Sequence, residues 1–210
     1  MKKLLLLIAI LSASASIAQE SDFGNWMIYF GNKKLGDKFN FHHEVQYRNY
    51  NMAGDLEQLL LRCGIGYKIG ESSNLLLGYG YIIGENYVDV GGEDMKLGSK
   101  ENRIYQQFIT KHKILRANVQ HRYRMEERWP EQTFRMRFRY FLSTNIPLNK
   151  PEMEPGAIYL SAYNELFIHL AQPSFDRIRT YGGLGYRINE NMKAEIGYMN
   201  QFFSTSSRDQ

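Results

Sequence analysis

The sequence predicts an all-β fold, an antiparallel up-and-down transmembrane β-barrel of about 10–12 strands. Three observations carry this prediction. Apolar and polar residues alternate with a period of two along most of the chain, which indicates strands. Several alternating segments run for about ten residues or more, longer than the roughly 5–6 residues of a usual soluble strand and close to the roughly 9–11 of a tilted membrane strand. The composition is rich in Tyr, Phe and Gly and poor in Pro, which favours strands over helices.

The N-terminus has the layout of a secretory signal peptide. Lys2 and Lys3 precede a short apolar run, and small residues follow up to Ala18. Because the apolar run is too short to cross a bilayer as a helix, we interpret residues 1–18 as a cleaved signal rather than a membrane anchor. The mature chain, residues 19–210, has the length of one domain and is predicted to leave the cytoplasm.

Charge and cysteine content bear on two classes of protein. The chain has 26 Lys and Arg against 22 Asp and Glu, and loss of the two signal lysines lowers the net charge from +4 to +2. That excess is too small for a dedicated nucleic-acid binder. Cys63 is the only cysteine, so no intrachain disulfide can stabilise the exported chain. We expect Cys63 to behave as a small apolar residue.

The alternation predicts ten strands, most with one apolar and one polar face. In the second, FNFHHEVQYR, Phe41 and Val45 lie opposite Glu44 and Arg48. LEQLLLRCGIGYKI and NLLLGYGYII continue with leucines, isoleucines and tyrosines opposite polar residues and glycines. LRANVQHRYRME and TFRMRFRYFL place arginines at alternate positions, and RIRTYGGLGYRI and KAEIGYMNQF repeat the plan. The predicted strands lie near residues 25–33, 39–49, 57–69, 75–84, 102–112, 114–127, 133–144, 157–168, 176–188 and 192–202.

The connections between these strands alternate in length. KLGDK, GESSN, KHK and INEN are tight, whereas NYNMAGD, ERWPEQ and residues 86–99 are predicted to be longer polar loops. Short periplasmic turns and longer outer loops are typical of outer-membrane barrels. The long connection at residues 145–156 breaks this pattern. A polar segment follows Phe203 where such barrels usually end on an aromatic residue, so the closing strand is expected to be missing from this chain, or another element closes the barrel.

Three stretches carry a resemblance to a known family. They are Glu44-Val-Gln46-Tyr-Arg48, then Glu101-Asn-Arg103 with Gln106 and Gln107, and the stretch His121–Trp129. With their surroundings, these stretches resemble an uncharacterised family of Gram-negative outer-membrane β-barrels that is classed only as a domain of unknown function. The resemblance covers nearly all of the mature chain. It implies a barrel in the cell outer membrane and supplies no substrate, reaction or partner.

Charged residues on the predicted inner face are the candidate functional residues. We expect them to form an internal salt-bridge network, because charges in a lumen must be paired or hydrated. The alternatives are a basic constriction that favours small anions and a bound anionic lipid. The candidates are Glu44, Arg48, Arg62, Arg116, Arg122, Arg124, Glu126, Arg135, Arg137, Arg139, Glu165, Arg177, Arg179 and Glu195.

Catalytic, metal and nucleotide motifs do not emerge from the sequence. His42 and His43 are adjacent on one strand and therefore point to opposite faces, and no G-x-S-x-G or HExxH spacing occurs. The glycine-rich stretches have strand spacing and no following helix, so they are not predicted to cradle phosphates. We expect no enzyme activity, no metal, no cofactor and no nucleic-acid partner.

The predicted function is an outer-membrane, porin-like barrel in contact with lipid, either a narrow channel or a structural element. The alternative is a soluble periplasmic barrel that carries a lipid or another apolar ligand, with its apolar faces turned inward. An outside hypothesis is a lipid-modifying hydrolase that uses His43 or His121.

Overall fold

The computed structural model describes residues 24–131, 133–171 and 175–204. The predicted signal peptide, residues 1–18, and the polar end of the chain, residues 205–210, lie outside the described residues. All ten predicted strands are found within the described residues. They are β1 (Asn25–Lys34), β2 (Phe39–Asn49), β3 (Leu56–Lys68), β4 (Ser73–Val90), β5 (Glu93–Ile114), β6 (Ala117–Pro130), β7 (Arg135–Pro147), β8 (Ile158–His169), β9 (Phe175–Arg187) and β10 (Lys193–Phe203).

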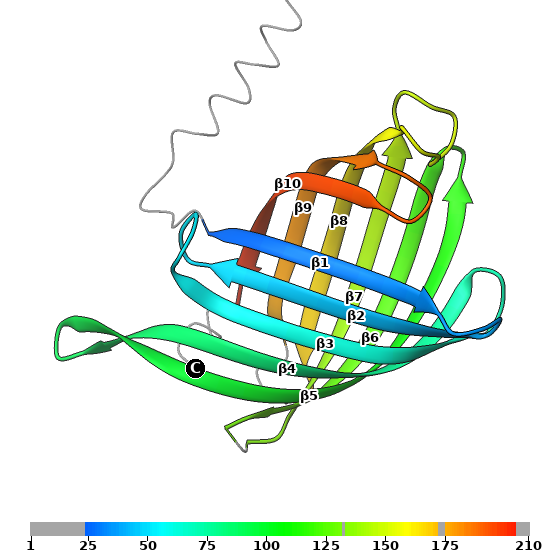
Figure 1. Cartoon of the computed structure of the whole chain (residues 1–210). Helices are drawn as coiled ribbons and strands as arrows, with labels where there is room; N and C mark the ends of the chain where they lie inside the picture. Colours follow the sequence, from blue (N-terminus) through cyan, green and yellow to red (C-terminus); the bar gives the residue numbers. More distant parts are fainter. Residues whose placement is uncertain (1–23, 132, 172–174, 205–210) are drawn as a thin grey trace, which may run out of the picture.

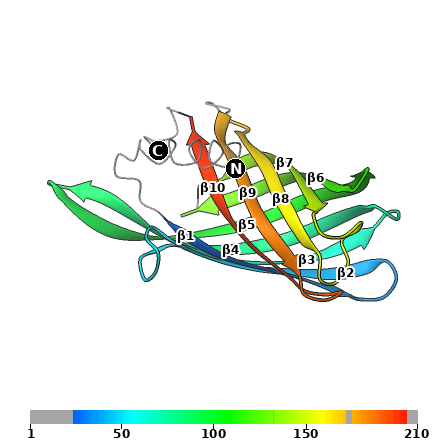
Figure 2. The ribbon, with the colours of Figure 1, turned by 90° about the horizontal axis from the view of Figure 1, so that it is seen from above.

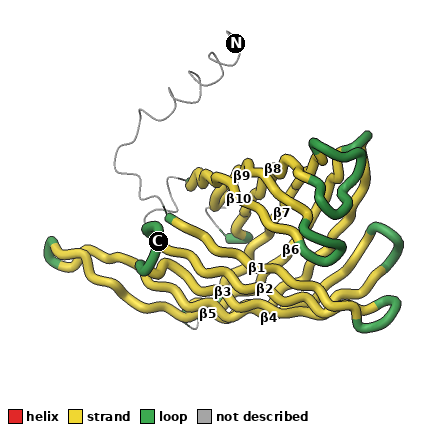
Figure 3. The backbone as a smooth tube through the Cα atoms, turned by 45° about the horizontal axis from the view of Figure 1, so that its top comes forward, coloured by secondary structure: helices red, strands yellow, loops and turns green. Residues whose placement is uncertain are grey.

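The ten strands form one antiparallel sheet in which each strand pairs with its neighbour in sequence, in the order β1 to β10. The sheet curls into a half-barrel, seen from the side in Figure 1 and from above in Figure 2. The tube in Figure 3 shows strands joined only by loops. In the part of the chain that the structure describes, no helix is long and apolar enough to cross a membrane.

The two edges of the sheet, β1 and β10, do not pair with each other within the described ranges. They nevertheless belong to walls that face each other, because the Arg179 guanidinium of β9 lies 4.9 Å from the ring centre of Trp26 in β1. The curl of the sheet therefore brings side chains of β1 and β9 together across the concave side.

The two faces of the sheet have opposite chemistry. On the concave face, Glu126 is 0% exposed and Arg124 only 2%. On the convex face, Leu77 is 59% exposed and Ile196 is 81% exposed. Because successive side chains of a strand point to opposite faces, the period-two pattern of the sequence produces this division directly. It is the reverse of a soluble protein, which buries apolar and exposes charged side chains.

The predicted loop at residues 86–99 is wrong, since these residues extend β4 and β5 into a hairpin that projects beyond the rest of the sheet (Figure 1). The hairpin closes at Gly91 and Gly92, whose φ angles of 71° and 91° lie in the left-handed region that glycine enters without strain. Its side chains also bond to the β2–β3 loop: Lys96 Nζ lies 2.5 Å from Asp55 Oδ1. The hydrogen bond from Lys96 lowers the pKa of the Asp55 carboxyl.

The boundary between β5 and β6 also differs from the prediction. The segment KHK was expected to turn, but β5 continues through it to Ile114. Leu115 turns the chain instead, with φ of 55° and 97% exposure. Alternation alone cannot place such a turn, because Leu115 has the apolar character of a strand residue.

The long connection between β7 and β8 is held by its own polar groups. Asn149 accepts a hydrogen bond from the Ile158 backbone N–H at 2.7 Å and donates one to the Gly156 carbonyl at 3.0 Å. Arg116 donates to the Lys150 carbonyl at 2.7 Å. The connection therefore joins the β5–β6 turn at the same end of the sheet.

Candidate functional site: an arginine-lined inner face

The centre of the inner face is built around one carboxylate, Glu126 of β6. Three arginines reach it: Arg139 Nη1 at 2.6 Å, Arg137 Nη2 at 2.7 Å and Arg124 Nη1 at 3.4 Å. Arg124 is two residues away on the same strand, and Arg137 lies directly opposite Glu126 on β7. The i, i+2 spacing and the antiparallel register therefore place all three cations on one face around one anion.

This cluster continues across the sheet to β8 and β9. Arg139 also donates to Glu165 Oε1 at 2.6 Å, and Arg122 reaches the same oxygen at 2.6 Å. Arg137 donates to Asp176 Oδ2 at 3.2 Å. A continuous set of charge-assisted hydrogen bonds thus ties four consecutive strands together, β6 to β9.

Two smaller clusters lie on the neighbouring strands. Glu101 accepts from Arg103 at 2.6 Å and from Arg128 at 2.5 Å. Glu44 of β2 accepts from Arg62 of β3 at 2.6 Å. Each buried carboxylate named so far is therefore bound to at least one arginine, as burial of a charge demands.

Aromatic rings also lie among the arginines of the inner face. Phe167 of β8 is 1% exposed and has four guanidinium groups within 6 Å of its centre, those of Arg137, Arg139, Arg177 and Arg179. Trp26 has the Arg48 guanidinium at 3.7 Å and that of Arg179 at 4.9 Å. The negative faces of these rings attract the cations without neutralising their charge.

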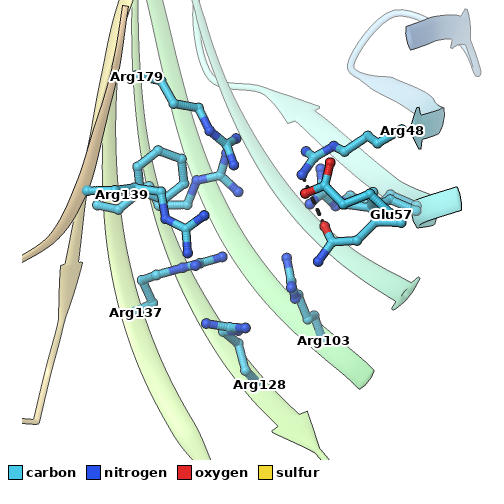
Figure 4. Close-up of a pocket in the computed structure, with 12 residues that line it drawn as sticks. Arg48, Glu57, Arg103, Arg128, Arg137, Arg139 and Arg179 are labelled. Carbon is cyan, nitrogen blue, oxygen red and sulfur yellow. Dashed lines mark hydrogen bonds between the residues drawn. The ribbon is translucent and has the colours of Figure 1, made fainter. Parts of the chain in front are cut away.

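A cavity of about 60 Å³ opens among these side chains and is named here the arginine cavity. Figure 4 shows Arg48 and Glu57 on one side of it, Arg179, Arg139 and Arg137 on the other, and Arg128 and Arg103 below, between the two sides. Glu57 is the sole carboxylate among its lining residues. The lining consists of Arg48, Glu57, Gln58, Leu60, Arg62, Arg103, Arg128, Arg137, Arg139, Phe167, Arg177 and Arg179.

Most of the candidates from the sequence meet on the concave face. The structure places there Glu44, Arg48, Arg62, Arg122, Arg124, Glu126, Arg137, Arg139, Glu165, Arg177 and Arg179. Three candidates lie apart from them. Arg116 sits in the β5–β6 turn, Arg135 is exposed at the start of β7, and Glu195 bonds to Tyr159 and Lys193 near the β10 edge.

Several residues of the site were not among the candidates. Glu101, Arg103 and Arg128 could have been found by extending the alternation along β5 and β6, because they follow the same period of two. Asp176 could not, since it is the extra residue of β9 at the register shift opposite Phe167 and Ile168, where the period is broken. The rings of Trp26 and Phe167 carry no sequence signal that separates them from other apolar residues.

The histidines that the hydrolase hypothesis uses lie away from the cavity. His43 shares a hydrogen bond of 3.0 Å with the Tyr29 hydroxyl, and His121 one of 2.8 Å with the Tyr140 hydroxyl. Both belong to the convex face by the alternation of their strands. Among the described residues, no group of three or more His, Cys, Asp or Glu side chains is placed to hold a metal ion.

Residues 23–210 match the family described as a protein of unknown function, DUF2490. The chain belongs to this family. It is also 29% identical over 204 residues to an uncharacterised protein of Methylorubrum extorquens, an alignment that covers 93% of this chain and 84% of the other. No solved structure gives a significant match. The DUF2490 assignment agrees with the expected uncharacterised family and adds no specific role.

Proposed function

We propose that this DUF2490 chain forms a β-barrel in the outer membrane of a Gram-negative bacterium, with lipid against its convex face. The observation that supports this most directly is the inversion of the two faces. Large apolar side chains stand exposed along the convex side of successive strands, among them Leu61, Leu77, Ile104, Leu160 and Leu184. In water this surface would favour aggregation, whereas lipid covers it at no cost.

The interior supports a narrow polar path rather than a wide pore. Buried arginines and carboxylates bond across the concave face and fill most of it, which leaves the arginine cavity as a small opening. The excess of arginine there favours anions by the logic of charged rings in pores. We therefore propose a barrel that is braced by its internal ion pairs and that admits small anions, and we propose no catalytic role.

A soluble carrier of an apolar ligand fits these faces poorly. Such a carrier needs its apolar stripes inside and its arginines outside, whereas Arg124, Arg137 and Arg139 are buried and the apolar stripes are exposed.

The proposed barrel also requires closure of the sheet. In lipid the backbone groups at the edges of β1 and β10 must be covered, by each other or by a further strand.

A matched pair of substitutions tests the membrane proposal. Leu77 lies on the convex face of β4 (Ser73–Val90) and is 59% exposed, and Leu148 lies in the β7–β8 connection and is 52% exposed. In water both sites would tolerate arginine equally. In a bilayer, Leu77→Arg should cost about 2–4 kcal/mol near the midplane, whereas a substitution outside the lipid costs roughly 0–1.

The measurement is folding into lipid vesicles, followed by gel mobility with and without boiling and by urea unfolding. The proposal predicts a membrane-retained, heat-shifting band for wild type and Leu148→Arg, and a weakened one for Leu77→Arg. Equal behaviour of the two variants, or recovery of wild type in the soluble periplasmic fraction, would reject it.

A further inference from the structure

We propose that the arginine cavity is a binding site for a compact, multiply charged oxyanion of the phosphate class, held by Arg48, Arg62 and Arg179. The cavity places eight arginines around about 60 Å³ of space with one carboxylate in the lining. The acids behind the lining are already engaged, since Glu126 alone binds three arginines. The positive charge of the cavity therefore exceeds what its neighbours neutralise.

Arg48 is the first residue that points to a missing anion. Its side chain is buried, with 5% of the residue exposed, yet no described carboxylate lies within ion-pair distance of it. It donates only to amide oxygens, to Gln46 Oε1 at 2.6 and 3.2 Å and to Gln58 Oε1 at 3.1 Å. A guanidinium has five N–H donors, so these three bonds leave two for a ligand. Burial of such a charge without an anion is costly.

Arg179 and Arg62 supply further free donors. Arg179 is 7% exposed; its Nε donates to Gln201 at 2.7 Å, and Glu165 is as far as 3.9 Å from it. Arg62 binds Glu44 through Nη1, but its Nε is buried and has no hydrogen-bond partner. In Figure 4, Arg48 and Arg179 come from opposite walls of the cavity, and both line it.

Trp26 holds these two arginines in place before any ligand arrives. Its ring lies 3.7 Å from the Arg48 guanidinium and 4.9 Å from that of Arg179. Two like charges are thus kept near each other by the ring rather than by an acid, which leaves their donors available. Such preorganisation reduces the ordering that binding would otherwise require.

The chemistry of the donors selects the ligand class. Planar guanidinium forks match the paired oxygens of phosphate, and several arginines favour an anion with more than one charge. The space is about four to six times the roughly 10–15 Å³ that one water requires, which suits a single tetrahedral oxyanion and not a large organic ligand. The inference rests on the folded inner face and goes beyond the proposed barrel by naming an equilibrium site and its ligand class.

Trp26 also provides the readout. The chain has two tryptophans, so Trp129→Phe leaves Trp26 as the single tryptophan. The folded protein in detergent is titrated with inorganic phosphate at constant ionic strength, with sodium chloride as the balancing salt. We expect a saturable change in Trp26 fluorescence and matching heat by calorimetry, with sulfate competing and chloride or acetate at the same ionic strength without effect.

Arg48→Gln tests the assigned residue, and Arg187→Gln is its control. Arg187 bonds to the exposed Glu190 in the β9–β10 turn, so its loss changes the net charge equally but leaves the cavity intact. Loss of a charge-assisted bond should weaken phosphate binding at least about tenfold in Arg48→Gln. Arg187→Gln should bind as wild type does. Equal affinity in all three proteins, or equal weakening in both variants, would overturn the assignment.

The outcomes separate this site from the proposed function. A heat-shifting, membrane-retained wild type that shows no saturable phosphate signal would overturn the site and leave the barrel. A soluble protein that binds phosphate through Arg48 would overturn the membrane barrel and leave the phosphate site. If Arg48→Gln fails to fold, wild type decides alone: phosphate should raise its unfolding midpoint above that in chloride of equal ionic strength, and no rise would overturn the site.

Discussion

Two regions of the inner face use buried arginine differently: the group around Glu126, and the pair Arg48 and Arg179. Around Glu126, the guanidinium groups of Arg124, Arg137 and Arg139 share a buried carboxylate. Arg48 is as deeply buried, but it finds amide oxygens and an aromatic ring instead. The comparison teaches that burial of arginine does not define its role. Guanidinium donors that a carboxylate takes up serve the structure, whereas donors without a carboxylate partner remain for a ligand.

The largest effect is expected at Glu126. Glu126→Gln should lower the free energy of unfolding by about 3–5 kcal/mol, because three buried arginines lose their shared anion. Urea unfolding of the vesicle-folded protein measures this. Glu190→Gln, which removes an exposed carboxylate in the β9–β10 turn, is the control and should stay within about 0.5 kcal/mol of wild type.

Arg48→Gln sharpens the contrast in the same assay. Removal of an uncompensated charge should offset the loss of its hydrogen bonds to Gln46 and Gln58, so we expect a change of less than about 1 kcal/mol. If Arg48→Gln destabilised the protein as much as Glu126→Gln does, the two regions would be alike and both would be structural.

A smaller effect is expected at Phe167, which lies between the two regions. Phe167→Leu should destabilise by about 1–2 kcal/mol, because four guanidinium groups lose the ring face while an apolar side chain remains. Phe175→Leu is the control, since Phe175 is 39% exposed at the start of β9. A loss no greater than that of the control would show that the ring only fills space.

The smallest effect concerns an ion pair outside the inner face, Lys96 with Asp55. The pKa of Asp55 is lowered in the folded protein, so the pair contributes above the ordinary Asp pKa of about 3.9 and is lost as pH falls through the lower folded value. Amide exchange of residues 86–99, corrected for intrinsic rates, should therefore rise modestly below about pH 4.

Asp55→Asn provides the control for this pH effect. In Asp55→Asn, amide exchange of residues 86–99 should already be faster than in wild type at neutral pH. It should then show no further rise below about pH 4, once corrected for intrinsic rates. Unchanged exchange in Asp55→Asn at neutral pH would mean that the projecting hairpin is held by its backbone pairing alone. Exposed pairs of this kind contribute little, in contrast to the buried Glu126 group.

Alternation in the sequence predicted the ten strands and, along β6 and β7, the face on which Arg124, Glu126, Arg137 and Arg139 lie. It could not predict which of these cations meet an anion, because that depends on register between strands that are separated by turns. Leu115 and the residues after Gly84 show a second limit: a pattern continues smoothly through a turn or past an expected strand end. Trp26 shows a third, since β1 is apolar on both faces and alternation gives its ring no preference.

The order of the sheet has a consequence for how the protein assembles. Each described pairing joins strands that are adjacent in sequence, so every step of sheet growth closes only the connection between two neighbours. Because the entropy cost rises slowly with loop length, even the long β7–β8 connection adds little to it. Pairing can therefore advance one hairpin at a time, as expected for a fold of low contact order. In the proposed barrel, a closure between β1 and β10 would differ, because the two strands lie at opposite ends of this order. We expect that closure to be the slow and late event in forming a complete barrel.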